Sequence, residues 1–149
     1  MYNTAMKYLP QSLEETSGIA RNFLDSINPG EKATVVALQG ELGAGKTTFA
    51  QAAGKILGIE ENMTSPTFVI MKVYEIDFKS FKNFIHVDAY RLERDSELLH
   101  LGWEDLISEP ENLVFIEWPE NVPGAIPRWA RKISFEFVDE NTREINYEG

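Results

Sequence analysis

Apolar and polar residues follow two different periods along this chain, and each period predicts one kind of element. The stretch 12–30, SLEETSGIARNFLDSINPG, has the helical period. It opens on the Ser-x-x-Glu spacing of a capping box at Ser12 and Glu15, and Asn28-Pro29-Gly30 should end it. The apolar residues that we expect on its core face are Leu13, Ala20, Leu24 and Ile27.

A buried strand, a glycine-rich loop and a second helix follow in that order. The apolar run Thr34 to Leu38 predicts the strand, and GELGAGKTTF, Gly40 to Phe49, forms the loop and the start of the helix. The helix should cover 46–57 and end at Gly58 as its C-terminal cap. We expect four of its residues to face the core: Phe49, Ala53, Ile56 and Leu57.

The second half of the chain is rich in strands. Two extended runs, Phe68 to Ile76 and Asn83 to Asp88, are separated by DFKSFK and predict a hairpin. One or two short helical segments should lie within 95–107, broken at Gly102. An apolar strand over 112–118 precedes an irregular stretch marked by three prolines, Pro119, Pro123 and Pro127. The alternating runs KISFEF and REINY then predict a terminal hairpin.

Length and charge narrow the classes of protein that fit. A chain of 149 residues suits one domain, residues 1–149, since single cores most often hold roughly 100–150 residues. Fourteen basic against twenty-four acidic residues give a net charge of −10, which disfavours direct binding to nucleic acid and favours a protein partner. The absence of cysteine excludes disulfides and thiolate chemistry. No run approaches a membrane span, and the first residues lack a secretory pattern, so we expect a cytoplasmic protein.

The glycine-rich loop carries the strongest chemical signal. Residues 40–47 satisfy G-x-x-x-x-G-K-[ST], with a predicted strand before the loop and a predicted helix after it. Glycines let successive backbone N–H groups point at phosphate oxygens, and the helix adds the positive end of its dipole. Lys46 should bridge the β- and γ-phosphates, and the Thr47 hydroxyl should contact Mg²⁺. The pattern predicts an α/β, P-loop NTPase-like three-layer fold, with a central mixed β-sheet flanked by helices.

Two acids end predicted strands and are candidates to complete a metal and hydrolysis site. Glu117 ends LVFIE and suits a metal-binding role, whereas Asp88 ends FIHVD and suits a role in holding water. His86 should point to the same side as Asp88, and a structural histidine is the simpler interpretation of it. Arg91 is compatible with a contact to phosphate, with a contact to a partner, and with a surface salt bridge.

The loop TSPTF, 64–68, lies where phosphate-loop switches often place a hydroxyl that senses the γ-phosphate through Mg²⁺. Thr67 is the candidate for this role. A turn that starts the next strand explains the same residues equally well.

Four segments in this order resemble the TsaE family, also called YjeE: GELGAGKTTF, TSPTF, HVDAYR and IEWPE. The resemblance covers nearly the whole chain. It implies a small Mg²⁺-dependent ATPase, with ATP and Mg²⁺ as cofactors, that acts in bacterial synthesis of N6-threonylcarbamoyladenosine in tRNA. It also implies TsaD and TsaB as partners, with ATP hydrolysis resetting the complex and tRNA reached only through that complex.

The resemblance further implies roles for individual residues. Thr47 and Glu117 match the Mg²⁺ positions, and Lys46 and Asp88 match the residues linked to hydrolysis. The positions that match nucleotide contacts are Gln11, Ser12, Leu42, Gly43, Ala44, Gly45, Lys46, Thr47, Thr48, Thr67 and Trp118. Contacts of the family's C-terminal end are not transferred, because the terminal hairpin is short here.

Two rival functions share a phosphate loop. A small-molecule kinase needs an acceptor pocket and usually an arginine-bearing lid, and the chain offers only Arg91, Arg94, Arg128 and Arg131, without a lid-like insertion. A GTP-dependent binding switch without turnover would need a guanine-reading segment, and no NKxD sequence is present. Adenine is therefore the favoured base.

Overall fold

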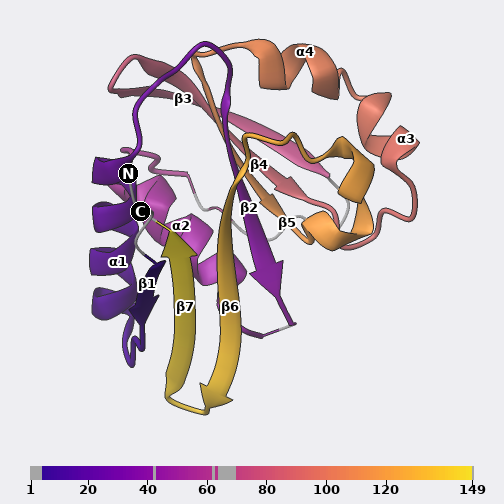
Figure 1. Cartoon of the computed structure of the whole chain (residues 1–149). Helices are drawn as coiled ribbons and strands as arrows, with labels where there is room; N and C mark the ends of the chain where they lie inside the picture. Colours follow the sequence, from indigo (N-terminus) through magenta and orange to yellow (C-terminus); the bar gives the residue numbers. More distant parts are fainter. Residues whose placement is uncertain (1–4, 42, 62, 64–69, 149) are drawn as a thin grey trace.

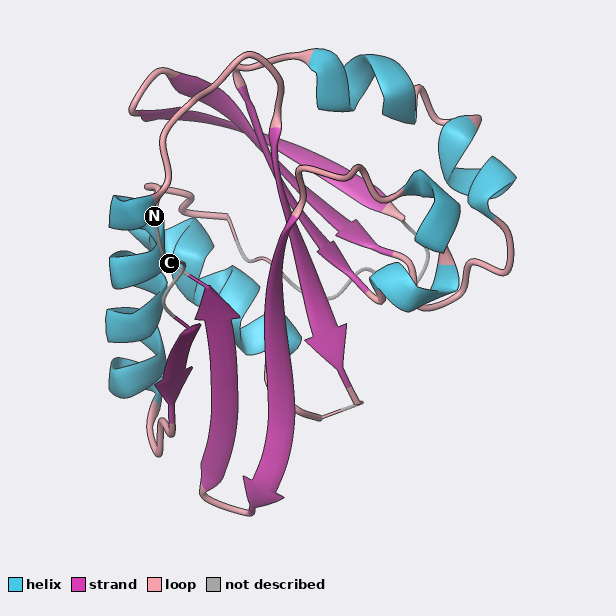
Figure 2. Ribbon diagram, viewed as in Figure 1, coloured by secondary structure: helices cyan, strands magenta, loops and turns pink. Residues whose placement is uncertain are grey.

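Seven strands form one sheet in this computed structural model, which describes residues 5–41, 43–61, 63 and 70–148. The strands are β1 (Ala5–Tyr8), β2 (Thr34–Gly40), β3 (Met71–Phe78), β4 (Phe81–Asp88), β5 (Asn112–Glu117), β6 (Arg131–Asp139) and β7 (Thr142–Glu148). The helices are α1 (Leu13–Ser26), α2 (Lys46–Ile56), α3 (Asp95–Leu99) and α4 (Trp103–Ser108), with short 3₁₀ turns η1 (Pro119–Asn121) and η2 (Pro123–Ala125). Figure 2 shows the strands of the sheet between the helices.

The strand order β1-β7-β6-β2-β5-β4-β3 puts four parallel strands in the middle of a mixed sheet. β2 pairs in parallel with β5 and β6, and β5 pairs in parallel with β4. The outer pairs β3–β4, β6–β7 and β1–β7 are antiparallel. In register, Leu38 lies opposite Glu117 and Glu117 opposite Asp88, so both predicted acids lie at the carboxyl edge of the sheet.

Helices cover both faces of the sheet, and each face has its own core (Figure 1). On the face of α1 and α2, the aromatic rings pack edge to face or stacked, as Phe49 does on Phe115 at 6.1 Å between centroids. On the other face, the fully buried Trp103 of α4 donates its indole N–H to the Ala125 carbonyl at 2.8 Å. The predicted α/β three-layer arrangement with a central mixed sheet is confirmed.

Most predicted elements are present, and one prediction about a core face is wrong. Ser12 caps α1 and accepts a hydrogen bond from the Glu15 N–H at 3.1 Å, as the capping-box spacing predicts. Leu13, expected on the core face, is 72% exposed. It lies in the first turn of α1, beside the cavity described below, whereas Ile19 and Phe23 fill the core further along the helix.

The β3–β4 hairpin is tighter than the sequence indicated. Its strands continue through Phe78 and resume at Phe81, so the expected six-residue connection shrinks to Lys79 and Ser80. Both residues have positive φ, 48° and 74°, which matches the right-handed twist of the flanking strands. The expected strand start at 68 and the TSPTF loop up to 68 lie outside the described residues.

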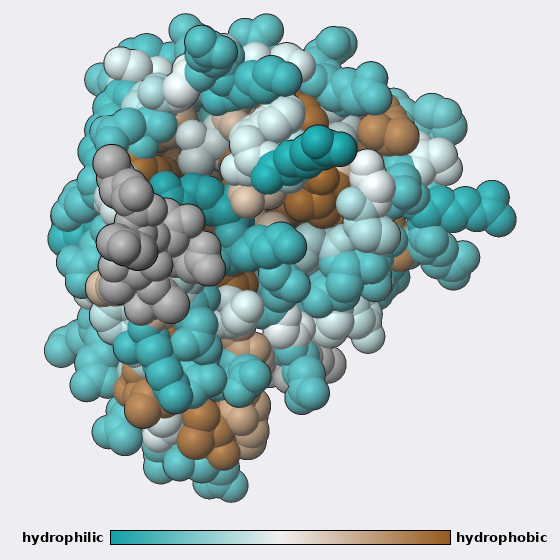
Figure 3. Space-filling view, in the orientation of Figure 1, coloured by the Kyte–Doolittle hydropathy of each residue, from teal (hydrophilic) through white to brown (hydrophobic). Residues whose placement is uncertain are grey.

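Strand β1 is an element that the sequence analysis did not predict. It adds to the sheet edge by pairing with β7, opposite Tyr147 and its neighbours. On the face that Figure 3 shows, the surface is largely hydrophilic, and some apolar surface lies near the lower ends of β6 and β7. Phe137 and Val138 of β6 are each 52% exposed in this region.

Candidate nucleotide-binding site

The glycine-rich loop connects the carboxyl end of β2 to the first residue of α2. Gly40, Gly43 and Gly45 have φ values of 150°, 79° and 103°, a region that favours glycine over residues with a side chain. At Gly40 a Cβ would lie 2.4 Å from the carbonyl oxygen of Phe135 on β6. The glycines therefore give the loop its turn and let β6 approach, and α2 begins with its N–H groups facing the loop.

Lys46 is buried at the base of this loop, although it carries a charge. Its side chain is only 4% exposed, and its ammonium donates to the Gly40 carbonyl at 2.5 Å. The same ammonium lies 3.2 Å from the ring centroid of Trp118, an attractive cation–π arrangement. Burial lowers the pKa of Lys46 from its usual range, and the negative charges of Glu120, Glu117 and Asp88 oppose this shift.

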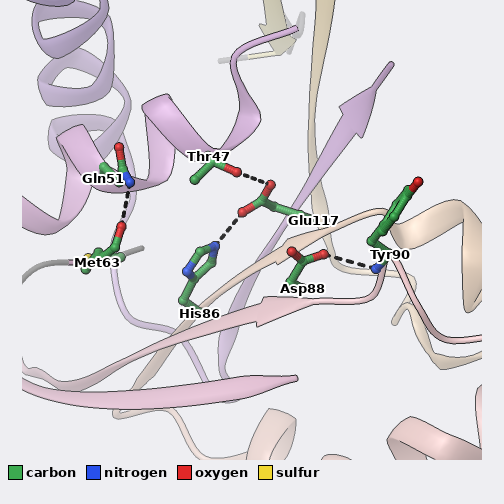
Figure 4. A network of polar contacts seen from close by, with 7 residues as sticks. All are labelled: Thr47, Gln51, Met63, His86, Asp88, Tyr90 and Glu117. Carbon is green, nitrogen blue, oxygen red and sulfur yellow. Dashed lines mark hydrogen bonds and ion pairs between the residues drawn. The ribbon is translucent and has the colours of Figure 1, made fainter. Parts of the chain in front are cut away.

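A chain of three polar side chains joins α2, β5 and β4 (Figure 4). Thr47 donates its hydroxyl to Glu117 Oε1 at 2.7 Å, and His86 Nε2 lies 2.6 Å from Glu117 Oε2. Glu117 and His86 are 2% and 1% exposed. Thr47 and Glu117, the two predicted Mg²⁺ positions, are thus in direct contact.

Asp88 lies beside this chain at the end of β4. Its Oδ1 accepts a hydrogen bond from the Tyr90 backbone N–H at 3.0 Å, which fixes the carboxylate at the strand end (Figure 4). Trp118 follows Glu117 in a left-handed conformation, φ 61° and ψ 49°, which is costly for a residue with a side chain. Its indole packs on Tyr90 with centroids 5.1 Å apart.

A cavity of about 460 Å³ opens in front of the loop. The lining residues include most of the predicted nucleotide contacts: Gln11, Ser12, Gly43, Gly45, Lys46, Thr47, Thr48 and Trp118, together with Asp88 and Glu117. Ala44 does not line it, because its side chain is fully buried in the core beside α1 and α2. Leu42 and Thr67 lie outside the described residues.

Further lining residues come from parts of the chain that the sequence did not connect with the loop. Arg143, the second residue of β7, donates from Nε to the Gly43 carbonyl at 3.0 Å. The Arg143 backbone N–H donates to the Pro10 carbonyl, and Gln11 donates its amide to the Thr142 hydroxyl at 3.4 Å. The terminal hairpin, the start of α1 and the phosphate loop therefore form one wall. No local pattern marked Arg143, since its partner is distant in sequence.

Arg91 and His86 take different places. Arg91 lies with Tyr90 and Asn121 in a neighbouring hollow and does not line the main cavity. His86 also does not line the cavity, and its ring nitrogen contacts Glu117 instead. The expectation of a histidine with a satisfied partner is confirmed, and that partner is a candidate metal ligand.

The side chains of Thr47 and Glu117 suit a cation that takes its other ligands from water and a bound substrate. Among the residues that the structure describes, no three His, Cys, Asp or Glu side chains converge into a metal cluster. A hydroxyl and a carboxylate in contact are oxygen donors of the kind Mg²⁺ takes, and Mg²⁺ is commonly held by one or two carboxylates, waters and substrate phosphates.

Comparison with known proteins decides the family. The profile of the family described as threonylcarbamoyl adenosine biosynthesis protein TsaE matches residues 10–145. This chain belongs to the TsaE family. The TsaE protein of Rickettsia felis is 34% identical over 131 residues, 87% of this chain and 72% of that protein. The TsaE protein of Bacillus subtilis is 32% identical over 142 residues, 95% of this chain and 84% of the relative.

Solved structures agree with the assignment to TsaE. The crystal structure of Bacillus subtilis YdiB superposes with a TM-score of 0.75 at 27% sequence identity. The superposition covers 100% of this chain and 88% of the YdiB chain. Within the described ranges, no helix combines the length and apolar character needed to cross a membrane.

Proposed function

We propose that this TsaE family member binds ATP with Mg²⁺ in the cavity in front of the phosphate loop and hydrolyses it. The observation that carries the proposal is that Lys46, Thr47 and Glu117 all line that cavity and that Thr47 and Glu117 are in contact. A single domain over residues 1–149 would perform this work in the cytoplasm, where it would serve the tRNA threonylcarbamoyladenosine pathway named by the family.

Binding would use the loop and α2. Backbone N–H groups of residues 43–48 would donate to phosphate oxygens at the positive end of the helix dipole. Lys46 would donate to the β- and γ-phosphates from its place between Gly40 and Trp118. Arg143 would support the loop from outside through the Gly43 carbonyl. The base would lie toward Gln11 and Ser12, which also line the cavity.

Hydrolysis would use the acids at the sheet edge. Thr47 and Glu117 would hold Mg²⁺, which would supply positive charge to offset the negative charge of the phosphates. Asp88, fixed by the Tyr90 N–H, would accept a hydrogen bond from the attacking water and orient it toward the terminal phosphate. Asp88 would therefore act on turnover more than on binding.

The partners that we propose are TsaD and TsaB, with tRNA reached only through them. The net charge of −10 supports the indirect route to tRNA, because a chain so acidic is repelled by the phosphate backbone of tRNA. ATP hydrolysis would then reset the protein complex between rounds of modification.

The test combines phosphate release with association. The protein is mixed with purified TsaD and TsaB in the presence of ATP or of ADP. The amounts of TsaD and TsaB that it captures and the free phosphate released are then measured. We expect nucleotide-dependent association and free phosphate. Asp88→Asn should bind ATP within about threefold of wild type and release phosphate at least tenfold more slowly, as expected when a group acts mainly in the transition state.

Asp105→Asn is the matched control, because Asp105 is exposed on α4, on the other face of the sheet. Transfer of the γ-phosphate to a metabolite would make the protein a kinase. Tight GTP binding with no release of phosphate would make it a binding switch. Either result contradicts the proposal.

A further inference from the structure

His86 is a buried side chain that the proposed hydrolysis does not use. It lies on β4, two residues before Asp88, with 1% of its surface exposed. Its Nε2 is 2.6 Å from Glu117 Oε2. If Glu117 is ionised, as the role of a Mg²⁺ ligand requires, its carboxylate only accepts hydrogen bonds, and His86 Nε2 is then the donor.

This contact completes a carboxylate that is held at both ends. Glu117 Oε1 accepts from Thr47 at 2.7 Å while Oε2 accepts from His86 (Figure 4). A carboxylate with 2% exposure needs such donors, because burial without them strongly disfavours its charged form. The two donors come from α2 and β4, so Glu117 on β5 is contacted from two other elements.

A glutamate needs this anchor more than an aspartate would. Its side chain has one more torsion, and rotation about the last torsion is broad in both residues, so the carboxylate of a glutamate has more freedom to move. Without a donor on Oε2, the carboxylate of Glu117 can turn its plane away from Thr47. His86 does not line the cavity, and its polar contact with Glu117 connects it to a residue that does.

We propose that His86 is a positioning residue that fixes Glu117 Oε1 toward Thr47 and thereby sets the Mg²⁺ affinity of the nucleotide site. This inference rests on the proposed function, since it takes Glu117 as a Mg²⁺ ligand. Residues that orient a metal ligand from behind change metal affinity by about 10- to 100-fold when replaced.

The experiment titrates Mg²⁺ into ATP binding by calorimetry, with a series in EDTA. His86→Leu keeps a side chain of similar bulk and removes the donor. We expect a 10- to 100-fold higher Mg²⁺ concentration at half-effect and an affinity for ATP in EDTA within about twofold of wild type. His86→Gln, which can place an amide N–H near Glu117, should recover most of the Mg²⁺ response.

The matched control is Asn83→Leu, at the other end of the same two strands. Asn83 donates its amide to Asn112 Oδ1 at 3.0 Å, also between β4 and β5, but far from the cavity. Its loss should lower the free energy of unfolding and leave the Mg²⁺ titration unchanged. A purely structural role for His86 would make His86→Leu behave in the same way as this control.

A second measurement reports the contact without nucleotide or metal. The chain has two histidines, and His100 is exposed. Ring-¹⁵N NMR should therefore show one slowly exchanging Nε2–H proton, from His86, that disappears in Glu117→Ala. If His86→Leu does not fold, His86→Asn replaces it, because its shorter amide should not reach Glu117 and should show the Mg²⁺ defect.

Each outcome separates the two proposals. A wild-type protein that responds to Mg²⁺, with His86→Leu or His86→Asn within twofold of it, overturns the role of His86 alone. A rapidly exchanging His86 proton that ignores Glu117→Ala overturns it as well. A wild-type protein that binds no ATP at any Mg²⁺ concentration overturns the proposed function and this inference together.

Discussion

Replacing Lys46 with methionine separates its effect on folding from its effect on the ligand. The substitution keeps an unbranched side chain of similar length and removes the charge. It deletes the hydrogen bond to Gly40, about 1.5–3 kcal/mol for a charged donor, and the cation–π contact with Trp118, about 0.5–2 kcal/mol. Removing a charge that is only 4% exposed returns a desolvation penalty of several kcal/mol.

The lost contacts and the relieved desolvation penalty nearly cancel in the stability of the folded protein. No such compensation applies to the binding of ATP. We expect Lys46→Met to change the free energy of unfolding by about 2 kcal/mol or less, because the sums above are of similar size. ATP affinity should fall by about 10- to 150-fold, since a charged donor to phosphate is worth about 1.5–3 kcal/mol.

Calorimetry with ATP and urea unfolding measure the two quantities. Lys55→Met is the control on the same helix, because Lys55 is exposed in the last turn of α2; it should leave ATP affinity within about twofold of wild type. ATP affinity of Lys46→Met within threefold of wild type would refute the phosphate contact. A loss of unfolding free energy above about 4 kcal/mol would refute the balance of burial and contact.

The difference in unfolding free energy between wild type and Lys46→Met should depend on pH, and the sign of this dependence follows from the pKa of Lys46. Burial lowers the pKa of folded Lys46 below the 10.5 of an ordinary lysine. Below the folded pKa the lysine is charged in both the folded and the unfolded state, so its burial penalty is present in full. The penalty is relieved as pH rises from the folded pKa toward 10.5, because the unfolded state binds more protons there. The unfolding free energy of wild type should therefore rise relative to Lys46→Met over that window.

Three further substitutions test other parts of the structure. Arg143→Met removes the support of the Gly43 carbonyl, and calorimetry should show an ATP affinity about fivefold lower, since a partly exposed hydrogen bond is worth about 1 kcal/mol; an unchanged affinity would make the contact incidental. Gly40→Ala places a Cβ 2.4 Å from the Phe135 carbonyl oxygen, and urea unfolding should show a loss of about 2–5 kcal/mol from overpacking and strain, whereas wild-type stability would contradict this close approach. Phe115→Ala empties the centre of the aromatic core and should lower the free energy of unfolding by about 3–5 kcal/mol, with a loss under 1 kcal/mol speaking against that packing.

Local patterns predicted a large part of the fold. The capping box at Ser12, the break at Gly102 and the alternation in the terminal hairpin all lie where the structure has them. Each of these signals depends on residues a few positions apart, so the sequence alone carries them. The exposed Leu13 shows the limit, because helical periodicity gives the direction of a side chain and not what covers it.

The sequence by itself determined the glycine-rich loop, the acids at the strand ends and the family. These features are short and contiguous, and their chemistry requires particular residues at fixed spacing. The tertiary structure alone decided that β1 extends the sheet, that Arg143 reaches Gly43 and that His86 holds Glu117. The reason is that strand order brings residues 31 and 100 positions apart into contact, and no local period records such a contact.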